Sequence, residues 1–151
     1  MTENEISKVI VGAAIEVHRT LGGPGLLEGV RFAHRRLRLT VYEEALAYEL
    51  LLRGLRVSRQ VEVPITYKGA LLASPLRLDL LVNDLVIVDC KAVTNYNPIF
   101  ESQVLTYLRL TDKRLGLVIN FGERQVVDGI HRVVNNLCFD FIIPRKIKTT
   151  I

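Results

Sequence analysis

Three of the five charged residues in the segment 76–91 are the best candidates for chemistry in this sequence, because they lie inside or at the end of apolar runs. Asp79 lies inside one apolar run, and Asp89 and Lys91 end the next. Charged groups among apolar residues cost free energy unless they are paired, hydrated in a cleft or bound to a metal. Two neighbouring carboxylates can bind a hard cation such as Mg²⁺, and a lysine beside them can orient water or stabilise charge on a phosphate. The set therefore fits phosphodiester hydrolysis, and a surface cluster of Asp–Lys ion pairs is the alternative.

The same segment predicts two antiparallel strands, Leu76–Val82 and Leu85–Val88, joined by a tight connection. Asp79 lies opposite Asp89 only if the numbers of paired residues sum to 168, which pairs Val82 with Val86 and leaves a three-residue loop. A two-residue turn would put the two acids on opposite faces unless a bulge restored the register. We expect the three-residue loop or a bulge. One face of this hairpin is then apolar and the other carries the charged set, the apolar members being Leu78, Leu80, Val82, Val86, Val88 and Cys90.

Length and composition indicate a single domain over residues 1–151. The chain has 49% apolar and 24% charged residues, which is typical of a soluble globular protein. No apolar run reaches the roughly 18–20 residues of a membrane span, and the polar, acidic N-terminus does not resemble a signal peptide. Cys90 and Cys138 show no metal-binding spacing, so we expect a reduced, cytoplasmic protein that does not enter a membrane.

The net charge of +4 is concentrated in two places. Residues 29–40 hold four arginines and no acid, and the C-terminal extension, residues 138–151, holds a second basic patch. The arginine-rich stretch fits either a helix or an extended segment, and its role is either a solvated basic face or contact with DNA phosphates. The arginines are Arg31, Arg35, Arg36 and Arg38.

The remaining pattern alternates helices and strands. Helical periodicity covers residues 6–21 and Val41–Arg53, with Ala45, Leu46, Tyr48, Glu49 and Leu52 on the expected inner half. A third helix follows Asn97-Pro98, and Gln103 is the polar member of its apolar stripe, so we expect it to face a polar site. A strand is expected at residues 60–67, and Pro64 indicates that it lies at an edge of the sheet. Further strands are expected at residues 115–120 and in a final hairpin formed by residues 125–127 and 130–134.

The order of these segments resembles the GxxExxY protein family, which is assigned to the PD-(D/E)XK nuclease superfamily. The resemblance covers roughly residues 5–135 and depends on several segments taken together. These segments are Gly25-Leu26-Leu27-Glu28, Val41–Leu50, Arg77-Leu78-Asp79, Asp89-Cys90-Lys91-Ala92, Gln103–Leu108 and Asn120-Phe121-Gly122. It implies an α/β fold with a restriction-endonuclease-like core, a mixed central β-sheet flanked by α-helices.

By this resemblance Asp79 matches the aspartate of the motif, Asp89 the (D/E) and Lys91 the lysine. Gln103 matches the glutamine on the following helix, and Glu28 matches the glutamate of GxxE, which would complete the metal site. The catalytic set is then Asp79, Asp89, Lys91 and Gln103, and the metal ligands are Asp79, Asp89 and Glu28.

Two departures from the family pattern affect this assignment. Asp89 stands where relatives usually carry the longer glutamate. Tyr42 follows Glu28 by fourteen residues instead of three, so residues 29–40 form a basic insert. A continuous helix through the insert would move Glu28 about 16 Å along the axis and away from the metal. Either the insert loops out at Gly29, or an internal glutamate such as Glu49 replaces Glu28; we favour the loop.

We therefore expect a Mg²⁺- or Mn²⁺-dependent nuclease that acts on nucleic acid, DNA rather than RNA. The insert arginines and Arg77, which shares a face with Asp79, are the expected phosphate contacts. The sequence is compatible with a homodimer. The alternative is a noncatalytic module that binds nucleic acid or protein and retains the nuclease fold. The insert beside Glu28 favours that alternative, whereas clustered acids would give a pure DNA binder no advantage.

Overall fold

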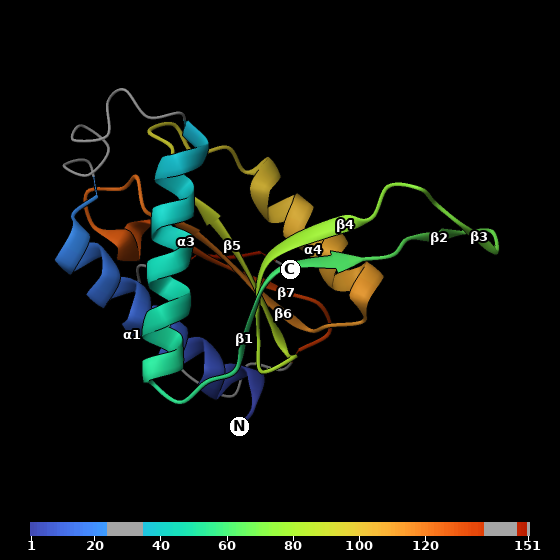
Figure 1. Ribbon diagram of the computed structural model, residues 1–151, viewed down its shortest axis with the longest axis horizontal. Helices are drawn as coiled ribbons and strands as arrows, with labels where there is room; N and C mark the ends of the chain where they lie inside the picture. Colours follow the sequence, from blue (N-terminus) through green and yellow to red (C-terminus); the bar gives the residue numbers. More distant parts are fainter. Residues whose placement is uncertain (24–34, 138–147, 151) are drawn as a thin grey trace.

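A six-stranded mixed sheet forms the centre of the molecule, and helices cover both of its faces (Figure 1). The computed structural model describes residues 1–23, 35–137 and 148–150. The strand order is β1-β4-β5-β6-β7-β8. The pairs β5–β6 and β7–β8 are parallel and the other three pairs are antiparallel. The strands are β1 (Val57–Val63), β4 (Leu76–Val82), β5 (Val86–Lys91), β6 (Leu115–Asn120), β7 (Ile130–Val134) and β8 (Lys148–Thr150).

Two helices, α1 (Glu3–Leu21) and α3 (Arg35–Leu52), pack on one face of the sheet, and α4 (Ile99–Thr111) packs on the other. The helix α4 is the crossover between the parallel strands β5 and β6. A short hairpin, β2 (Thr66–Tyr67) and β3 (Ala70–Leu71), forms a separate two-stranded sheet. This arrangement is the mixed α/β architecture that the sequence pattern predicts.

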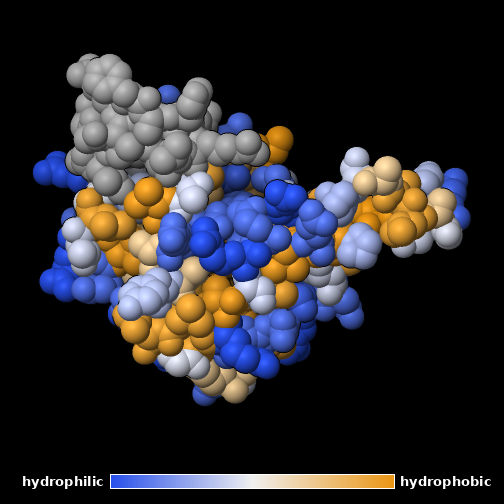
Figure 2. Space-filling view, in the orientation of Figure 1, coloured by the Kyte–Doolittle hydropathy of each residue, from blue (hydrophilic) through white to orange (hydrophobic). Residues whose placement is uncertain are grey.

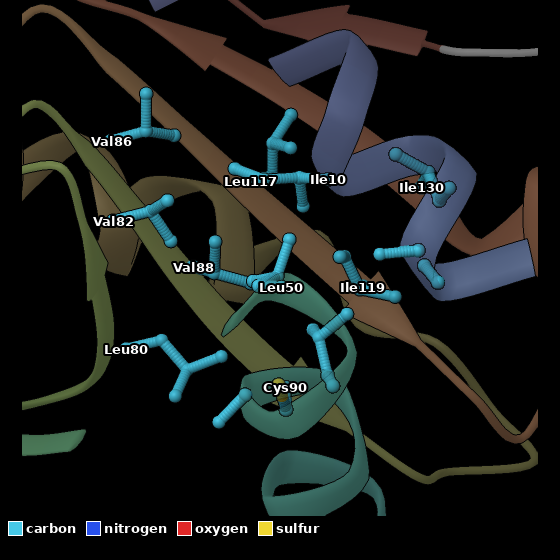
Figure 3. Packing of buried hydrophobic residues seen from close by; sticks show 14 of the residues in the cluster. Ile10, Leu50, Leu80, Val82, Val86, Val88, Cys90, Leu117, Ile119 and Ile130 are labelled. Atoms are coloured by element: carbon cyan, nitrogen blue, oxygen red, sulfur yellow. The ribbon is translucent and has the colours of Figure 1, made fainter. Parts of the chain in front are cut away.

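The larger core lies between the sheet and the α1–α3 layer. Ile10 and Leu50 from the two helices meet Val88, Leu117 and other strand residues (Figure 3). Burial of such side chains contributes about 1.5–3 kcal/mol each, which makes this layer the main source of stability. The start of α1 is fixed by a capping box, in which Thr2 Oγ1 accepts the Glu5 amide at 3.2 Å and Glu5 Oε2 accepts the Thr2 amide at 2.7 Å.

The second face of the hairpin is also core over most of its length, which corrects the expectation of one polar face. Leu81 and Ile87 are buried against Val104 and Leu108 of α4. The charged groups are confined to one end of the hairpin, because α4 covers the rest of that face. The alternation of side chains along a strand could not show this, because it assigns each residue to a face of the hairpin but does not reveal which element covers that face.

The helix α3 begins at Arg35, six residues before the predicted start, so residues 35–40 of the arginine-rich stretch are helical. Its buried positions include Tyr42, Leu46 and Leu50, spaced four residues apart. The predicted inner half was wrong for Tyr48 and Leu52, whose side chains are exposed. The apolar residues of this helix occur on more than one side, so periodicity did not identify the buried side.

The final predicted hairpin is only partly confirmed. Residues 130–134 form β7, but residues 126–129 form a 3₁₀ helix, η1 (Val126–Gly129), and β7 pairs instead with β6. The C-terminal residues 148–150 add an edge strand next to β7. Pro64 follows β1, which is the opposite edge strand, as predicted. No helix in the described ranges has the length and apolar character needed to cross a membrane.

Candidate active site

The predicted register of the β4–β5 hairpin is confirmed. Leu80 pairs with Val88 and Val82 pairs with Val86, so the numbers of paired residues sum to 168 as required. The connection is the three-residue loop 83–85, where Asn83 and Asp84 adopt positive φ angles of 50° and 57°. Asparagine and aspartate tolerate this left-handed conformation better than most residues, and the loop therefore fixes which face each acid occupies.

The backbone pairing opens at Asp79, and its side chain occupies the opening. The β4–β5 ladder ends at Leu80–Val88, and in the β1–β4 ladder the paired residues skip Gln60, which stands opposite Asp79 with φ at 51°. Asp79 Oδ2 accepts the Cys90 amide at 2.9 Å. A side-chain carboxylate thus satisfies an amide that a strand neighbour would otherwise satisfy. This opening places the Asp79 carboxylate beside β5.

The alternation of side chains changes at the same point. Leu80 belongs to the core under α1 and α3, whereas Leu78, two residues earlier, belongs to the core under α4. The prediction that both share one face was wrong, because it assumed a regular strand through Asp79. The irregular backbone here is local and coincides with the charged residues.

Asp89 and Lys91 lie at the end of β5 and form an ion pair. The Lys91 Nζ to Asp89 Oδ2 distance is 3.2 Å, and the two side chains are 20% and 9% exposed. The buried Asp89 Oδ2 has no hydrogen bond of regular geometry within the described residues, and the Asp89 side chain interacts with both Lys91 and Asp79. A buried carboxylate oxygen without a hydrogen bond retains free coordination capacity.

Burial and the neighbouring groups shift the pKa values of both carboxylates. Burial, together with the charge of Asp89, raises the pKa of Asp79 to about 6, although the Cys90 amide and Lys91 act in the opposite direction. Burial also raises the pKa of Asp89, and Lys91 opposes this shift. A bound cation would remove this penalty, because it favours the ionised form of both groups. Burial likewise raises the pKa of the fully buried Cys90 thiol, which makes Cys90 a poor nucleophile.

Two neighbours hold Lys91 in place. Its ammonium lies 4.6 Å from the centroid of the Phe100 ring, within the range of a cation–π contact. Its carbonyl accepts the Phe121 amide at 2.8 Å. The buried Asn120 then ties down the next turn, since its Oδ1 accepts the Val93 amide and its Nδ2 donates to the Val93 carbonyl, both at 3.0 Å. From the sequence, Asn120 was identified only as the end of a strand and as part of the Asn120-Phe121-Gly122 segment of the family resemblance, without a role at the site.

Glu43 is a buried acid near the pair that was not identified from the sequence either. It lies on α3, and both of its carboxylate oxygens accept Gln60 Nε2 at 3.0 Å. Arg59 Nε donates to it at 3.3 Å. Its charge is one of the influences that raise the pKa of Asp89, so it acts on the site through its field. Gln60, which stands opposite Asp79, thereby links α3 to the opening in the sheet.

Gln103 does not lie on the buried stripe of α4, which corrects that prediction. The stripe contains Val104 and Leu108, while Gln103 is exposed and its Nε2 donates to the Tyr107 hydroxyl at 2.6 Å. Burial raises the pKa of Tyr107 and so does the charge of Asp89. The Gln103–Tyr107 pair therefore lies within the field of the acidic pair.

The other predicted site residues are spread apart or fall outside the described residues. Arg77 is exposed and forms an ion pair with Glu62 at 2.9 Å. Glu49 forms an ion pair with Arg53 at 2.9 Å, whereas the glutamate of α3 that influences Asp89 is Glu43. Glu28 and Arg31 lie outside the described residues, as do the side chains of three further predicted phosphate contacts, Arg35, Arg36 and Arg38.

The donor atoms fit a hard divalent cation with a small number of protein ligands. No group of three His, Cys, Asp or Glu side chains in the described ranges is spaced to hold a metal ion. Mg²⁺ commonly binds through only one or two carboxylates and keeps several waters, and Asp79 and Asp89 supply two. The buried Asp89 Oδ2 is the observation that favours such an ion.

Comparisons with known proteins agree with this chemistry. Residues 4–133 match a family model described as the PD-(D/E)XK nuclease superfamily. Neither the curated proteins nor the solved structures give a significant match to the chain.

Proposed function

Because the chain belongs to the PD-(D/E)XK nuclease superfamily, we propose that it hydrolyses phosphodiester bonds in nucleic acid with a bound divalent metal ion. Membership suggests nuclease activity and nucleic-acid binding, and nucleases of this superfamily generally use divalent metals. The observation that carries the proposal is the convergence of two largely buried carboxylates with raised pKa values and one lysine. Such a cluster costs stability in a protein that does not use it.

Asp79 and Asp89 are the proposed metal ligands and Mg²⁺ or Mn²⁺ the proposed ion. When bound, a divalent cation lowers the pKa of a coordinated water and neutralises charge on the scissile phosphate. Glu28 remains the proposed third ligand, as the closer resemblance to the GxxExxY family implies. Glu43 is proposed to act differently, because its carboxylate is already occupied by Gln60 and Arg59.

Lys91 is proposed to position the attacking water or to stabilise the charge that develops on the phosphate. Its contact with Phe100 and the short ion pair with Asp89 limit the positions of the ammonium, and preorganised charge is effective because little reorganisation is needed during reaction. Gln103 is proposed to orient a phosphate or a ligand together with Tyr107, to which it is hydrogen bonded.

The nucleic acid is proposed to be DNA, held through phosphate contacts of Arg31, Arg35, Arg36 and Arg38 in the insert. Arg77 is a weaker candidate because it is paired with Glu62. An exposed pair of this kind is worth only about 0–1 kcal/mol, so a phosphate could replace the glutamate at little cost. Binding that depends on these contacts must weaken as salt rises.

The test compares metal-dependent nicking of plasmid and single-stranded DNA by the wild type and by Lys91→Met. Methionine has an unbranched side chain of similar length and removes the charge. We expect activity to fall by at least about 100-fold, the usual loss when a preorganised charge-stabilising group is removed. Lys8→Met is the matched control, because Lys8 is exposed on α1, which covers the other face of the sheet.

Equal activity of the wild type and Lys91→Met would refute the role of Lys91. If the wild type cleaves nothing with Mg²⁺ or Mn²⁺, yet binds DNA with an affinity that survives Asp79→Asn and chelation of metal, the chain is the noncatalytic binding module instead. Salt-dependent binding alone does not support catalysis, because phosphate contacts produce it in either case.

A further inference from the structure

One residue of β1 adopts a backbone conformation that strands rarely contain. Gln60 has a φ angle of 51°, and within the described ranges it is the one non-glycine residue inside a strand whose φ is positive. Glutamine adopts this left-handed conformation less readily than glycine, asparagine or aspartate. Such a conformation persists only where surrounding contacts impose it, and positions of this kind gather at functional sites. The contacts around Gln60 therefore indicate what its conformation is for.

Gln60 stands opposite Asp79, and both strands change faces at this pair. The β1–β4 ladder keeps one register on either side and omits only this pair. On β1, Val57 packs on the core under α1 and α3, whereas Val61 packs on the core under α4, although regular alternation would put both on one face. The strand β4 changes faces at Asp79 as well. The change is thus concentrated at a single pair of residues.

This change of faces determines where the Asp79 carboxylate lies. In a regular hairpin the backbone of β4 would satisfy the amides of β5 that point toward it. Here Asp79 Oδ2 accepts the Cys90 amide at 2.9 Å instead. The carboxylate is then close enough to Asp89 for the charge of Asp89 to raise the pKa of Asp79. The geometry of the acidic pair therefore depends on the opening of the ladder.

The side chain of Gln60 ties the opening to α3. Its Nε2 donates to both carboxylate oxygens of Glu43 at 3.0 Å, and Glu43 is buried. A hydrogen bond to a carboxylate is stronger than one between neutral groups. Gln60 itself is exposed, and on the face seen in Figure 2 hydrophilic residues lie between α3 and the strands β1 and β4. A substitution at Gln60 can therefore break this link without removing a side chain from the core.

We propose that Gln60 is a positioning residue for the acidic pair. Its left-handed backbone and its bond to Glu43 hold the β1–β4 ladder open, and the opening places the Asp79 carboxylate beside the strand that carries Asp89. The consequence for metal binding rests on the proposed function, whereas the place of Asp79 is a property of the metal-free fold. The alternative is that Gln60 only satisfies the buried Glu43, and its backbone conformation then has no effect on Asp79.

Hydrogen exchange of the Cys90 amide, followed by NMR in the presence of a chelator, reports the position of Asp79 without metal or substrate. Gln60→Val removes the side-chain bond and disfavours a positive φ, because valine is β-branched. We expect Cys90 to exchange at least about tenfold faster, the effect of losing one hydrogen bond. The Phe121 amide, which donates to the Lys91 carbonyl at 2.8 Å, should change much less. A general loss of stability would instead accelerate both amides together.

Two further variants separate the backbone conformation from the side-chain bond. Gln60→Gly removes the same bond but readily accepts a positive φ, so protection of Cys90 should fall less than in Gln60→Val. Ser58→Val is the matched control and should leave Cys90 unchanged, because Ser58 is exposed on the same strand and pairs regularly with Leu81. If Gln60→Val does not fold, Gln60→Gly decides, since faster exchange must then be confined to Cys90.

Calorimetric titration with Mn²⁺ tests the consequence for metal binding. Gln60→Val should bind Mn²⁺ at least about tenfold more weakly than the wild type, as is usual when a group that orients a ligand is lost, and Ser58→Val should bind it equally well. Equal affinity of the wild type and Gln60→Val overturns the proposal.

The exchange experiment can overturn the proposal independently of metal. Unchanged protection of Cys90 in Gln60→Val and Gln60→Gly does so, and so does an acceleration that Phe121 shares. Equal acceleration in these two variants assigns Gln60 to Glu43 alone. If Cys90 responds as expected while the wild type binds no Mn²⁺, the positioning of Asp79 is supported and the metal-dependent function is refuted.

Discussion

Replacing Asp79 by asparagine is expected to stabilise the metal-free fold while it removes a metal ligand. Asparagine has nearly the size of aspartate, and its Oδ1 can still accept the Cys90 amide that Asp79 Oδ2 accepts at 2.9 Å. The substitution therefore removes the charge and keeps the hydrogen bond.

The magnitude follows from the pKa of Asp79, which rises from its ordinary value of 3.8 to about 6 in the folded protein. The raised pKa means that the folded state disfavours the ionised carboxylate, so the wild type loses stability as pH rises between these two values. Integrated over the titration, the penalty is about 0.5 kcal/mol at pH 4 and about 3 kcal/mol at pH 8. The gain from Asp79→Asn should be small in acid and approach about 3 kcal/mol above pH 6.

Urea unfolding in the presence of a chelator, at about pH 4 and pH 8, measures this difference through the midpoint at constant m-value. Asp84→Asn is the control, because Asp84 is a highly exposed turn residue whose positive φ asparagine also tolerates. Its effect should not depend on pH in this way. Mg²⁺ should stabilise the wild type at pH 8 and have a much smaller effect on Asp79→Asn, since a ligand that binds only the folded state stabilises it.

An equal destabilisation by Asp79→Asn at both pH values would refute this account of the acidic pair. That outcome would mean that the carboxylate contributes to stability through its hydrogen bond and not against it through its charge. We infer that the acidic pair binds a cation because the pair lowers the stability of the metal-free fold. That outcome would remove the basis of this inference.

Two further substitutions test the framework around the site. Tyr42→Phe should cost about 1–2 kcal/mol in urea unfolding, because the buried hydroxyl donates to the carbonyls of Gly22 and Gly23 at 2.7 and 2.9 Å; an unchanged midpoint would show that these bonds contribute nothing. Gly122→Ala should cost about 1–3 kcal/mol, because its Cβ would lie 2.4 Å from the Val93 carbonyl oxygen. Thermal unfolding tests this prediction, and an unchanged unfolding temperature would mean that the backbone of the turn after β6 shifts to accommodate the added Cβ.

The acidic pair explains why a site of this kind is visible in a single sequence. Asp79 lies inside one apolar run and Asp89 follows another, and a charged residue is conspicuous at such positions. The two residues that support them, Glu43 and Asn120, do not stand out in the same way. Glu43 lies in a helix with several glutamates, and Asn120 lies at a strand end followed by a turn, so neither type nor spacing distinguishes them.

The sequence alone determined the features that depend on local chemistry and on side-chain parity. The 168 register followed from the requirement that Asp79 and Asp89 share a face, and the loop residues Asn83 and Asp84 allowed it. The strand–helix–strand order from β5 to β6 followed from short apolar runs and the Asn97-Pro98 helix start, because strand length and helix caps are local properties.

Only the tertiary structure decided which side of each helix is buried and how the sheet opens at the site. Tyr48 and Leu52 were expected on the inner side of their helix yet are exposed, because burial depends on which neighbour covers a surface. The displacement of Leu78 relative to Leu80 arises where Asp79 replaces a backbone partner of β5. Both outcomes depend on contacts between segments far apart in the chain, and no local pattern of residue types encodes such contacts.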